Sequence, residues 1–318
     1  MTMAKAKEFD AEDGRPEACS EEEIALLLEK TSRTFALAIP LLPEPTRLHV
    51  GVAYLLFRIA DTFEDAELWQ REQKLDALDR FGRLLAQPSA AEARAETARW
   101  LAEPPCTDPG YLELLRRAPA VLAACWRLGE APRRLIAEHT RRTVQGMARF
   151  VHGGADDGSL ALADVDELKG YCYVVAGIVG EMLTELFLLG RKALTPLSAF
   201  LRQRSAGFGE ALQLVNILKD SLADASHGRR FLSAGADLAP VFRLARRDLR
   251  VAARYVLGLQ RAAAPRGIVA FTALPVRLAQ ATLARVEENG PGAKLSRPEV
   301  FGIVESLNLA LDQGLPAV

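Results

Sequence analysis

Two predicted helices carry polar side chains along one face of an otherwise apolar surface, and this feature limits the possible folds most. The first helix spans residues 48–69, LHVGVAYLLFRIADTFEDAELW. Its polar residues step by 4, 3 and 4, so they share one helical face, the first acidic stripe, formed by Tyr54, Arg58, Asp61 and Asp65. Because apolar residues flank it on both sides, we expect the stripe to face inward.

The second such helix lies in residues 207–231, GFGEALQLVNILKDSLADASHGRRF. Its polar and small residues step by 4, 3, 4 and 4 and form the second acidic stripe: Gly209, Gln213, Asn216, Asp220 and Asp224. Buried carboxylates one turn apart need cations or donors, and hard oxygen ligands in this arrangement suit Mg²⁺ shared with phosphate oxygens. We therefore predict that the two stripes converge on magnesium from opposite walls of a cavity.

A simpler interpretation of the first stripe remains open. It could be an exposed acidic helix end, in which Arg58 pairs with Asp61 or Asp65 one turn away. The matching spacing in a second helix favours the functional interpretation, because inward-facing polar stripes on buried helices usually serve a site.

Breaks rich in Pro and Gly divide the rest of the chain into helical segments, and no segment shows the alternation of a strand. Ser20 followed by Glu23 predicts a capping box at the first helix, and Asp164 or Asp166 predicts the N-cap of the helix that holds Tyr171. We predict an all-α fold, with a flexible leader at residues 1–19 and a single domain at residues 20–318.

Charge and cysteine usage exclude several function classes. The 318 residues carry 40 Lys and Arg against 41 Asp and Glu, so the net charge of -1 gives no reason to expect nucleic acid as a partner. The four cysteines are scattered without a CxxC pair, which indicates reduced thiols rather than a zinc site. We expect a cytoplasmic monomer or weak homo-oligomer.

Residues 171–190, YCYVVAGIVGEMLTELFLLG, are long enough to cross a membrane. However, Glu181 and Glu185 lie on one face of this helix, and two carboxylates inside a bilayer are costly. We therefore expect a buried helix rather than a transmembrane segment, and at most peripheral contact with the inner membrane face. Its small residues, Ala176, Gly177 and Gly180, indicate either tight helix packing or room for a long isoprenoid chain.

Five motifs occur in an order that resembles the squalene/phytoene synthase family. They are SRTF at 32–35, AYLLFRIADTFED at 53–65, GMARF at 146–150, YCYVVAGIVG at 171–180, and the segment 213–224 followed by GRRF at 228–231. FTALPVRLAQATL at 271–283 extends the similarity. The resemblance implies the isoprenoid synthase helical bundle with a central cavity.

The resemblance also implies roles for individual residues. The residues implied to bind Mg²⁺ are Asp61, Glu64, Asp65, Asn216, Asp220 and Asp224. Those implied to contact the diphosphates are Ser32, Arg33, Arg58, Lys219 and Arg229, and those implied to lie near the ionising carbon are Tyr54 and Tyr171. Lys294 and Arg297 resemble late residues that help squalene synthases to bind NADPH.

Four positions depart from the family pattern. Lys219 replaces the usual Arg, Ser221 an apolar residue, Ala223 a frequent Glu, and Ser233 a common Pro. The Asp residues of both stripes remain, and Lys keeps a positive charge while losing the bidentate fork of Arg. The departures therefore bear on substrate and rate more than on reaction class.

The implied function is head-to-head condensation of two farnesyl diphosphates, through a cyclopropyl diphosphate, to squalene with Mg²⁺ and NADPH. A phytoene or dehydrosqualene synthase, which does not reduce its product, is the first alternative, and an enzyme that forms presqualene diphosphate or hydroxysqualene is another. A non-catalytic relative that acts in assembly or lipid binding would belong to a different class. Head-to-tail elongators and terpene cyclases usually carry DDxxD, which is not the pattern of either stripe.

Overall fold

The protein folds into a bundle of α-helices, seen in a computed structural model that describes residues 17–32, 34–154, 160, 162–226, 231 and 238–318, with only the backbone for residues 222–226. No strand occurs in these residues, as predicted. The helices are α1 Glu21–Thr31, α2 Phe35–Ala38, η1 Ile39–Leu41, α3 Thr46–Glu64, α4 Arg71–Ala86, α5 Ala90–Ala102, α6 Pro109–Arg116, α7 Ala118–Trp126, α8 Glu130–Gly153, α9 Val165–Cys172, η2 Tyr173–Gly177, α10 Ile178–Leu188, η3 Lys192–Leu197, α11 Ser198–Ser226, α12 Ala239–Arg261, α13 Arg266–Asn289 and α14 Arg297–Asp312.

Capping residues set several of these helix ends, as the sequence predicts. The Ser20 hydroxyl accepts a hydrogen bond from the Glu23 amide, and the Glu23 carboxylate accepts one from the Ser20 amide, so the predicted capping box is present. Of the two candidates for the N-cap of α9, Asp164 fills the position. The first acidic helix ends at Glu64, so the last five residues of the predicted segment, 65–69, lie beyond it.

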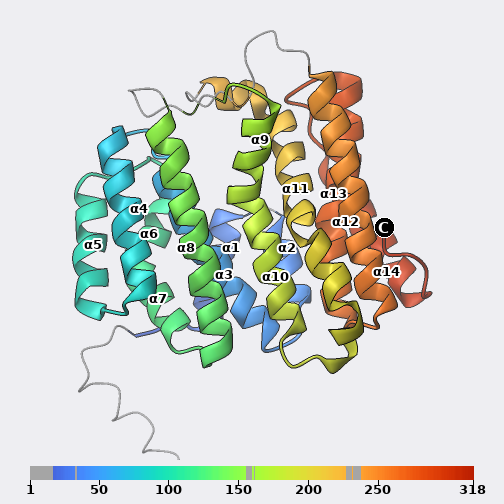
Figure 1. Ribbon diagram of the computed structural model, residues 1–318, viewed down its shortest axis with the longest axis horizontal. Helices are drawn as coiled ribbons and strands as arrows, with labels where there is room; N and C mark the ends of the chain where they lie inside the picture. Colours follow the sequence, from blue (N-terminus) through green and yellow to red (C-terminus); the bar gives the residue numbers. More distant parts are fainter. Residues whose placement is uncertain (1–16, 33, 155–159, 161, 227–230, 232–237) are drawn as a thin grey trace, which may run out of the picture.

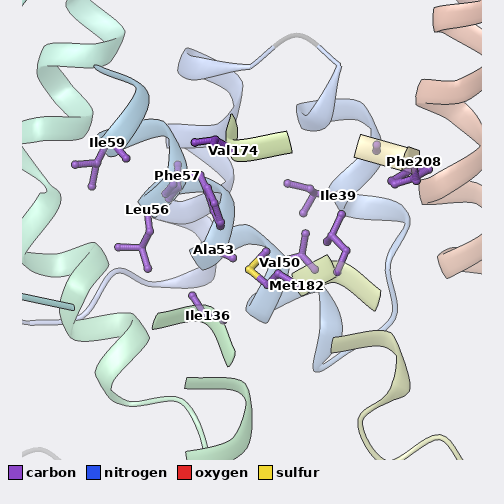
Figure 2. Packing of buried hydrophobic residues seen from close by; sticks show 14 of the residues in the cluster. Ile39, Val50, Ala53, Leu56, Phe57, Ile59, Ile136, Val174, Met182 and Phe208 are labelled. Atoms are coloured by element: carbon purple, nitrogen blue, oxygen red, sulfur yellow. The ribbon is translucent and has the colours of Figure 1, made fainter. Parts of the chain in front are cut away.

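Helix α3 lies in the middle of the apolar core. Figure 1 shows α8, the α9–α10 segment, α11 and α12 side by side, with α1 to α3 behind them. Figure 2 shows α3 side chains beside those of α8, η2 and α10, among them Ala53, Leu56, Ile136, Val174 and Met182. Because α3 is buried on several faces, the Thr62 and Glu64 side chains of its last turns are buried, while those of Arg58 and Asp61 remain 26% and 30% exposed.

Two glycines bring α11 against the α9–α10 segment at backbone distance. A Cβ atom at Gly209 would lie 1.9 Å from the Ala176 carbonyl oxygen, and one at Gly180 would lie 2.0 Å from the Ser205 carbonyl oxygen. Residues 173–177 form a π-helix between α9 and α10. Of the two interpretations of the small residues in this segment, the structure shows the close helix packing.

Within the described part of the chain, two helical segments are long and apolar enough to cross a membrane by length and composition. They are Val165–Leu188, which the sequence indicates, and Arg266–Asn289, which the sequence interpretation missed. In each, 61% of the most apolar window is buried inside the protein. Such burial is typical of core helices, which agrees with the expectation for residues 171–190.

The end of the predicted leader and all four cysteines lie within the described residues. Residues 1–16 lie outside the described part of the chain, whereas Cys19 is buried and its amide donates to the Ala120 carbonyl oxygen at 3.2 Å. The end of the predicted leader therefore belongs to the packed fold. All four cysteines are free, as expected.

Candidate active site

A cavity of about 810 Å³ contains most of the side chains that the sequence singles out. It lies between α3, α6, the α9–α10 segment, α11 and α13. The predicted site residues that line it are Ser32, Tyr54, Arg58, Asp61, Glu64, Asp65, Tyr171, Asn216, Lys219, Asp220 and Lys294. Residues far apart in sequence thus meet at one place.

The first acidic stripe faces this cavity along its whole length. Nη2 of Arg58 donates to the Tyr54 hydroxyl at 2.9 Å, and Nη1 lies 3.4 Å from Oδ2 of Asp61. The ion pair that the simpler interpretation expects is therefore present, but it lines a cavity instead of ending an exposed helix. Burial opposes the charge on Arg58, yet Tyr54 and Asp61 outweigh it, so the pKa of the guanidinium lies above its ordinary value.

The second acidic stripe divides into a packing part and a cavity part. Gly209 contacts the backbone of η2, while Gln213, Asn216 and Asp220 line the cavity. Nζ of Lys219 lies 3.0 Å from Oδ2 of Asp220 and donates to Oδ1 of Asn216 at 3.3 Å. Lys219 thus neutralises one candidate ligand and holds the other.

Tyr171 and Glu64 form a buried polar contact at the wall of the cavity. The Tyr171 hydroxyl donates to both carboxylate oxygens of Glu64, at 3.2 and 3.3 Å, and both residues are at least 94% buried. The rings of Phe150 and Phe231 pack on Tyr171 with centroids at 5.3 and 5.1 Å. The aromatic contacts fix the orientation of the phenol, and the phenol holds the carboxylate.

The loop after α13 also contributes to the cavity. The Gly292 amide donates to the Lys219 carbonyl oxygen at 2.7 Å, which ties this loop to α11 beside Asp220. Gly290 and Gly292 have φ values of 81° and 89°, a conformation that favours glycine. This turn brings Lys294 to the cavity, whereas Arg297 begins α14 and is not among the lining residues.

Helix α6 and its N-cap supply two cavity residues, Tyr111 and Asp108, that sequence reasoning missed. The signal available in the sequence was the dipeptide Asp108-Pro109, which is typical of a helix start. That pattern predicts the helix but does not indicate that its first turn meets Arg58, since the meeting depends on tertiary packing.

Three predicted site residues lie wholly or partly outside the described structure. Arg33 and Arg229 are not described, and Asp224 is described by its backbone in α11 alone. Their roles therefore remain expectations from the sequence.

The oxygen donors of the cavity fit Mg²⁺ held jointly with a phosphate group. Among the described residues, no three Asp, Glu, His or Cys side chains are grouped closely enough to hold a metal by themselves. Mg²⁺ keeps several water ligands and typically binds through one or two carboxylates together with substrate phosphates. Asp61 and Asp65 on α3 and Asp220 on α11 provide such carboxylates on separate walls of the cavity.

Comparison with known proteins places this geometry in context. A family model described as squalene/phytoene synthase matches residues 28–235. Squalene synthase LSS of Botryococcus braunii is 31% identical over 198 residues, which cover 62% of this chain and 38% of that protein. The chain spans less than half the length of the curated relatives it matches.

Solved structures agree in fold. TcSQS in complex with the ligand BPH1237 superposes with a TM-score of 0.66 at 25% identity, covering 92% of this chain and 88% of that one. A dehydrosqualene synthase superposes with a TM-score of 0.59 at 18% identity, covering 92% and 96%. The family match extends over both acidic stripes, and the chain therefore belongs to the squalene/phytoene synthase family.

Proposed function

We propose that this protein condenses two molecules of farnesyl diphosphate head to head, through a cyclopropyl diphosphate, to squalene. The observation that carries the proposal is that the acidic stripes of α3 and α11 line one cavity, with Arg58 and Lys219 among their carboxylates. Carboxylates from two walls together with fixed cations suit a diphosphate and its magnesium ions. The similarity to squalene synthases supports the choice of reaction.

Loss of the diphosphate is the step that these side chains would assist. Bound Mg²⁺ would supply charge stabilisation for the leaving group. Asp61, Asp65, Asn216 and Asp220, with Glu64 and Asp224, would hold the ions, while Ser32, Arg58 and Lys219, with Arg33 and Arg229, would donate to diphosphate oxygens. The Lys219 contacts with Asn216 and Asp220 would have to rearrange when the ions bind.

The remaining walls of the cavity suit the hydrocarbon part of the substrate. Phe35, Leu212, Val215, Pro275 and Leu278 line it, and such side chains offer no nucleophile to an allylic cation. The phenols of Tyr54 and Tyr171 would lie near the ionising carbon, where an aromatic ring stabilises positive charge. Exclusion of water would direct the cation to the second substrate instead of to an alcohol.

Reduction by NADPH would end this reaction by delivering hydride to the rearranged cation. Its support is the similarity to squalene synthases and the position of Lys294 at the cavity. Arg297, the second residue expected to bind the cofactor, adds no support because it is absent from the lining. A dehydrosqualene or phytoene synthase, which releases a proton instead, is therefore the second candidate.

The test is product analysis with the purified full chain. The protein is incubated with farnesyl or geranylgeranyl diphosphate and Mg²⁺, with and without NADPH, and the extracted hydrocarbons are identified by mass spectrometry. The proposal expects squalene from farnesyl diphosphate only when NADPH is present.

Other outcomes would change the assignment in defined ways. A dehydrogenated C30 product or a C40 product that needs no NADPH would establish the second candidate. Folded protein that converts neither substrate would contradict catalysis and favour a non-catalytic role in assembly or lipid binding.

A further inference from the structure

We propose that Tyr111 is a positioning residue that holds the Arg58 guanidinium for the diphosphate. The inference deepens the proposed function and rests on it, since it assumes that Arg58 meets a diphosphate. Its starting observation is that the Arg58 Cζ atom lies 5.5 Å from the ring centroid of Tyr54 and 5.8 Å from that of Tyr111. Both distances fall within the range of a cation–π contact.

The two rings reach Arg58 from different helices. Tyr54 lies one turn before Arg58 on α3, so its contact is local. Tyr111 belongs to the first turn of α6, and its side chain therefore depends on how α6 is placed against α3. Tyr111 supplies the part of the Arg58 environment that α3 cannot provide by itself.

The sequence around Tyr111 fixes the start of α6 tightly. Oδ1 of Asp108 accepts hydrogen bonds from the amides of Gly110 and Tyr111, at 2.8 and 3.0 Å. A Cβ atom at Gly110 would lie 2.7 Å from the Lys30 carbonyl oxygen, so glycine allows α6 to approach the end of α1. The cap and the close approach together set the position of the Tyr111 ring.

Arg58 has a particular need for such support. One Nη atom binds Tyr54 and the other faces Asp61, while the buried Nε has no hydrogen-bond partner within the described part of the chain. A long side chain such as that of Arg58 loses rotamer freedom when it binds an anion. The Tyr111 ring restricts the Arg58 guanidinium before any ligand binds. The entropy that Arg58 loses on binding a diphosphate is therefore smaller.

The Tyr111 phenol itself stays neutral near pH 7. Burial raises its pKa above the ordinary value, and the nearby Arg58 charge opposes the shift only in part. Tyr111 therefore adds no negative charge to compete with a diphosphate. Its contribution to Arg58 is the face of its ring.

The test is calorimetric titration of the full chain with inorganic diphosphate in the presence of Mg²⁺. We expect Tyr111→Leu to weaken binding by about 2- to 30-fold, and Tyr111→Phe, which keeps the ring, to change it by less than about twofold. Leu112→Ala, on the same helix but outside the cavity lining, is the matched control and should bind like wild type.

To test whether Tyr111 acts through Arg58, the Tyr111→Leu change is repeated in an Arg58→Met background. We expect the second change to have almost no further effect there, because the cation is gone. If Tyr111→Leu does not fold, pentafluorophenylalanine at position 111 keeps the ring shape while weakening its attraction for a cation, and should weaken binding in the same direction.

Three results would each overturn the inference while leaving the proposed function intact: wild-type affinity in Tyr111→Leu, an equal loss with and without Arg58, or unchanged affinity with the fluorinated ring. Wild-type protein that binds no magnesium diphosphate would overturn the proposed function and this inference together, so the two failures are distinguishable.

Discussion

The Tyr171 hydroxyl donates to both oxygens of the Glu64 carboxylate, joining α9 to the last turn of α3 across the buried wall of the cavity. Both groups were expected to act on substrate or metal directly. Their contact adds a structural role, because the hydrogen bond fixes the relative position of two helices that face the same cavity. A carboxylate retains further lone pairs for a cation, so the contact leaves the expected Mg²⁺ role possible.

This hydrogen bond should be measurable as an energetic coupling. We expect Tyr171→Phe, which removes the donor, and Glu64→Leu, which removes both acceptors, to be less destabilising together than the sum of their separate effects, with a coupling of about 1 kcal/mol. Urea unfolding of the two single variants and the double variant, without metal, gives the value. Effects that simply add would show that the contact contributes nothing to stability.

Gly209 should tolerate no side chain. Gly209→Ala would place a methyl group 1.9 Å from the Ala176 carbonyl oxygen, and backbone atoms on both sides have to move to admit it. We expect a loss of at least about 2 kcal/mol of unfolding free energy, together with weaker magnesium diphosphate binding, because α11 carries Asn216 and Asp220.

The matched control for Gly209 is Gly302→Ala on α14, where nothing lies within 4 Å of the added methyl group. That change should stabilise the helix slightly, by up to about 1 kcal/mol. If chemical denaturation gives the same stability for Gly209→Ala as for wild type, the close contact between α11 and η2 is wrong.

Glu210 should make stability depend on pH. Burial raises the pKa of its carboxyl, Asp248 and Glu181 raise it further, and Arg247 and Lys169 oppose the shift. Because the folded protein then binds a proton that the unfolded chain has released, stability falls as pH rises from the ordinary Glu value through the raised one.

Replacing Glu210 with glutamine removes that dependence. Glu210→Gln should raise the melting temperature at pH 8 by on the order of 2 °C, and should leave it nearly unchanged at pH 4, where the native carboxyl is protonated. Thermal melts across this pH range check the prediction. An equal change in melting temperature at both pH values would contradict it.

Helical periodicity predicted much of the fold and the site, because it depends on local sequence. The spacing of Asp61 and Asp65 placed them on one face, and the matching spacing of Asn216 and Asp220 indicated the opposite wall. Caps at Ser20 and Asp164 were also readable, since a cap is decided within four residues.

Contacts between distant segments could not be predicted in the same way. Tyr111 reaches Arg58 only because Gly110 lets α6 approach the end of α1, and no pattern in one chain encodes that meeting. Tertiary packing also decides which residues of the second acidic stripe reach the cavity. Gly209 shares a helical face with Asp220, yet the backbone of η2 covers Gly209. Lys294 reaches the cavity through two glycines of positive φ, whereas Arg297 does not.

The central claim is that α3 and α11 hold one diphosphate site between them. The most direct test is Mg²⁺-dependent release of diphosphate from farnesyl diphosphate, compared in wild type, Asp61→Asn, Asp220→Asn and the control Asp76→Asn, whose carboxylate lies on α4 outside the cavity lining. We expect at least about a hundredfold loss of rate for either cavity variant and a normal rate for the control. Release that continues at the wild-type rate without Asp61 or without Asp220 would contradict it.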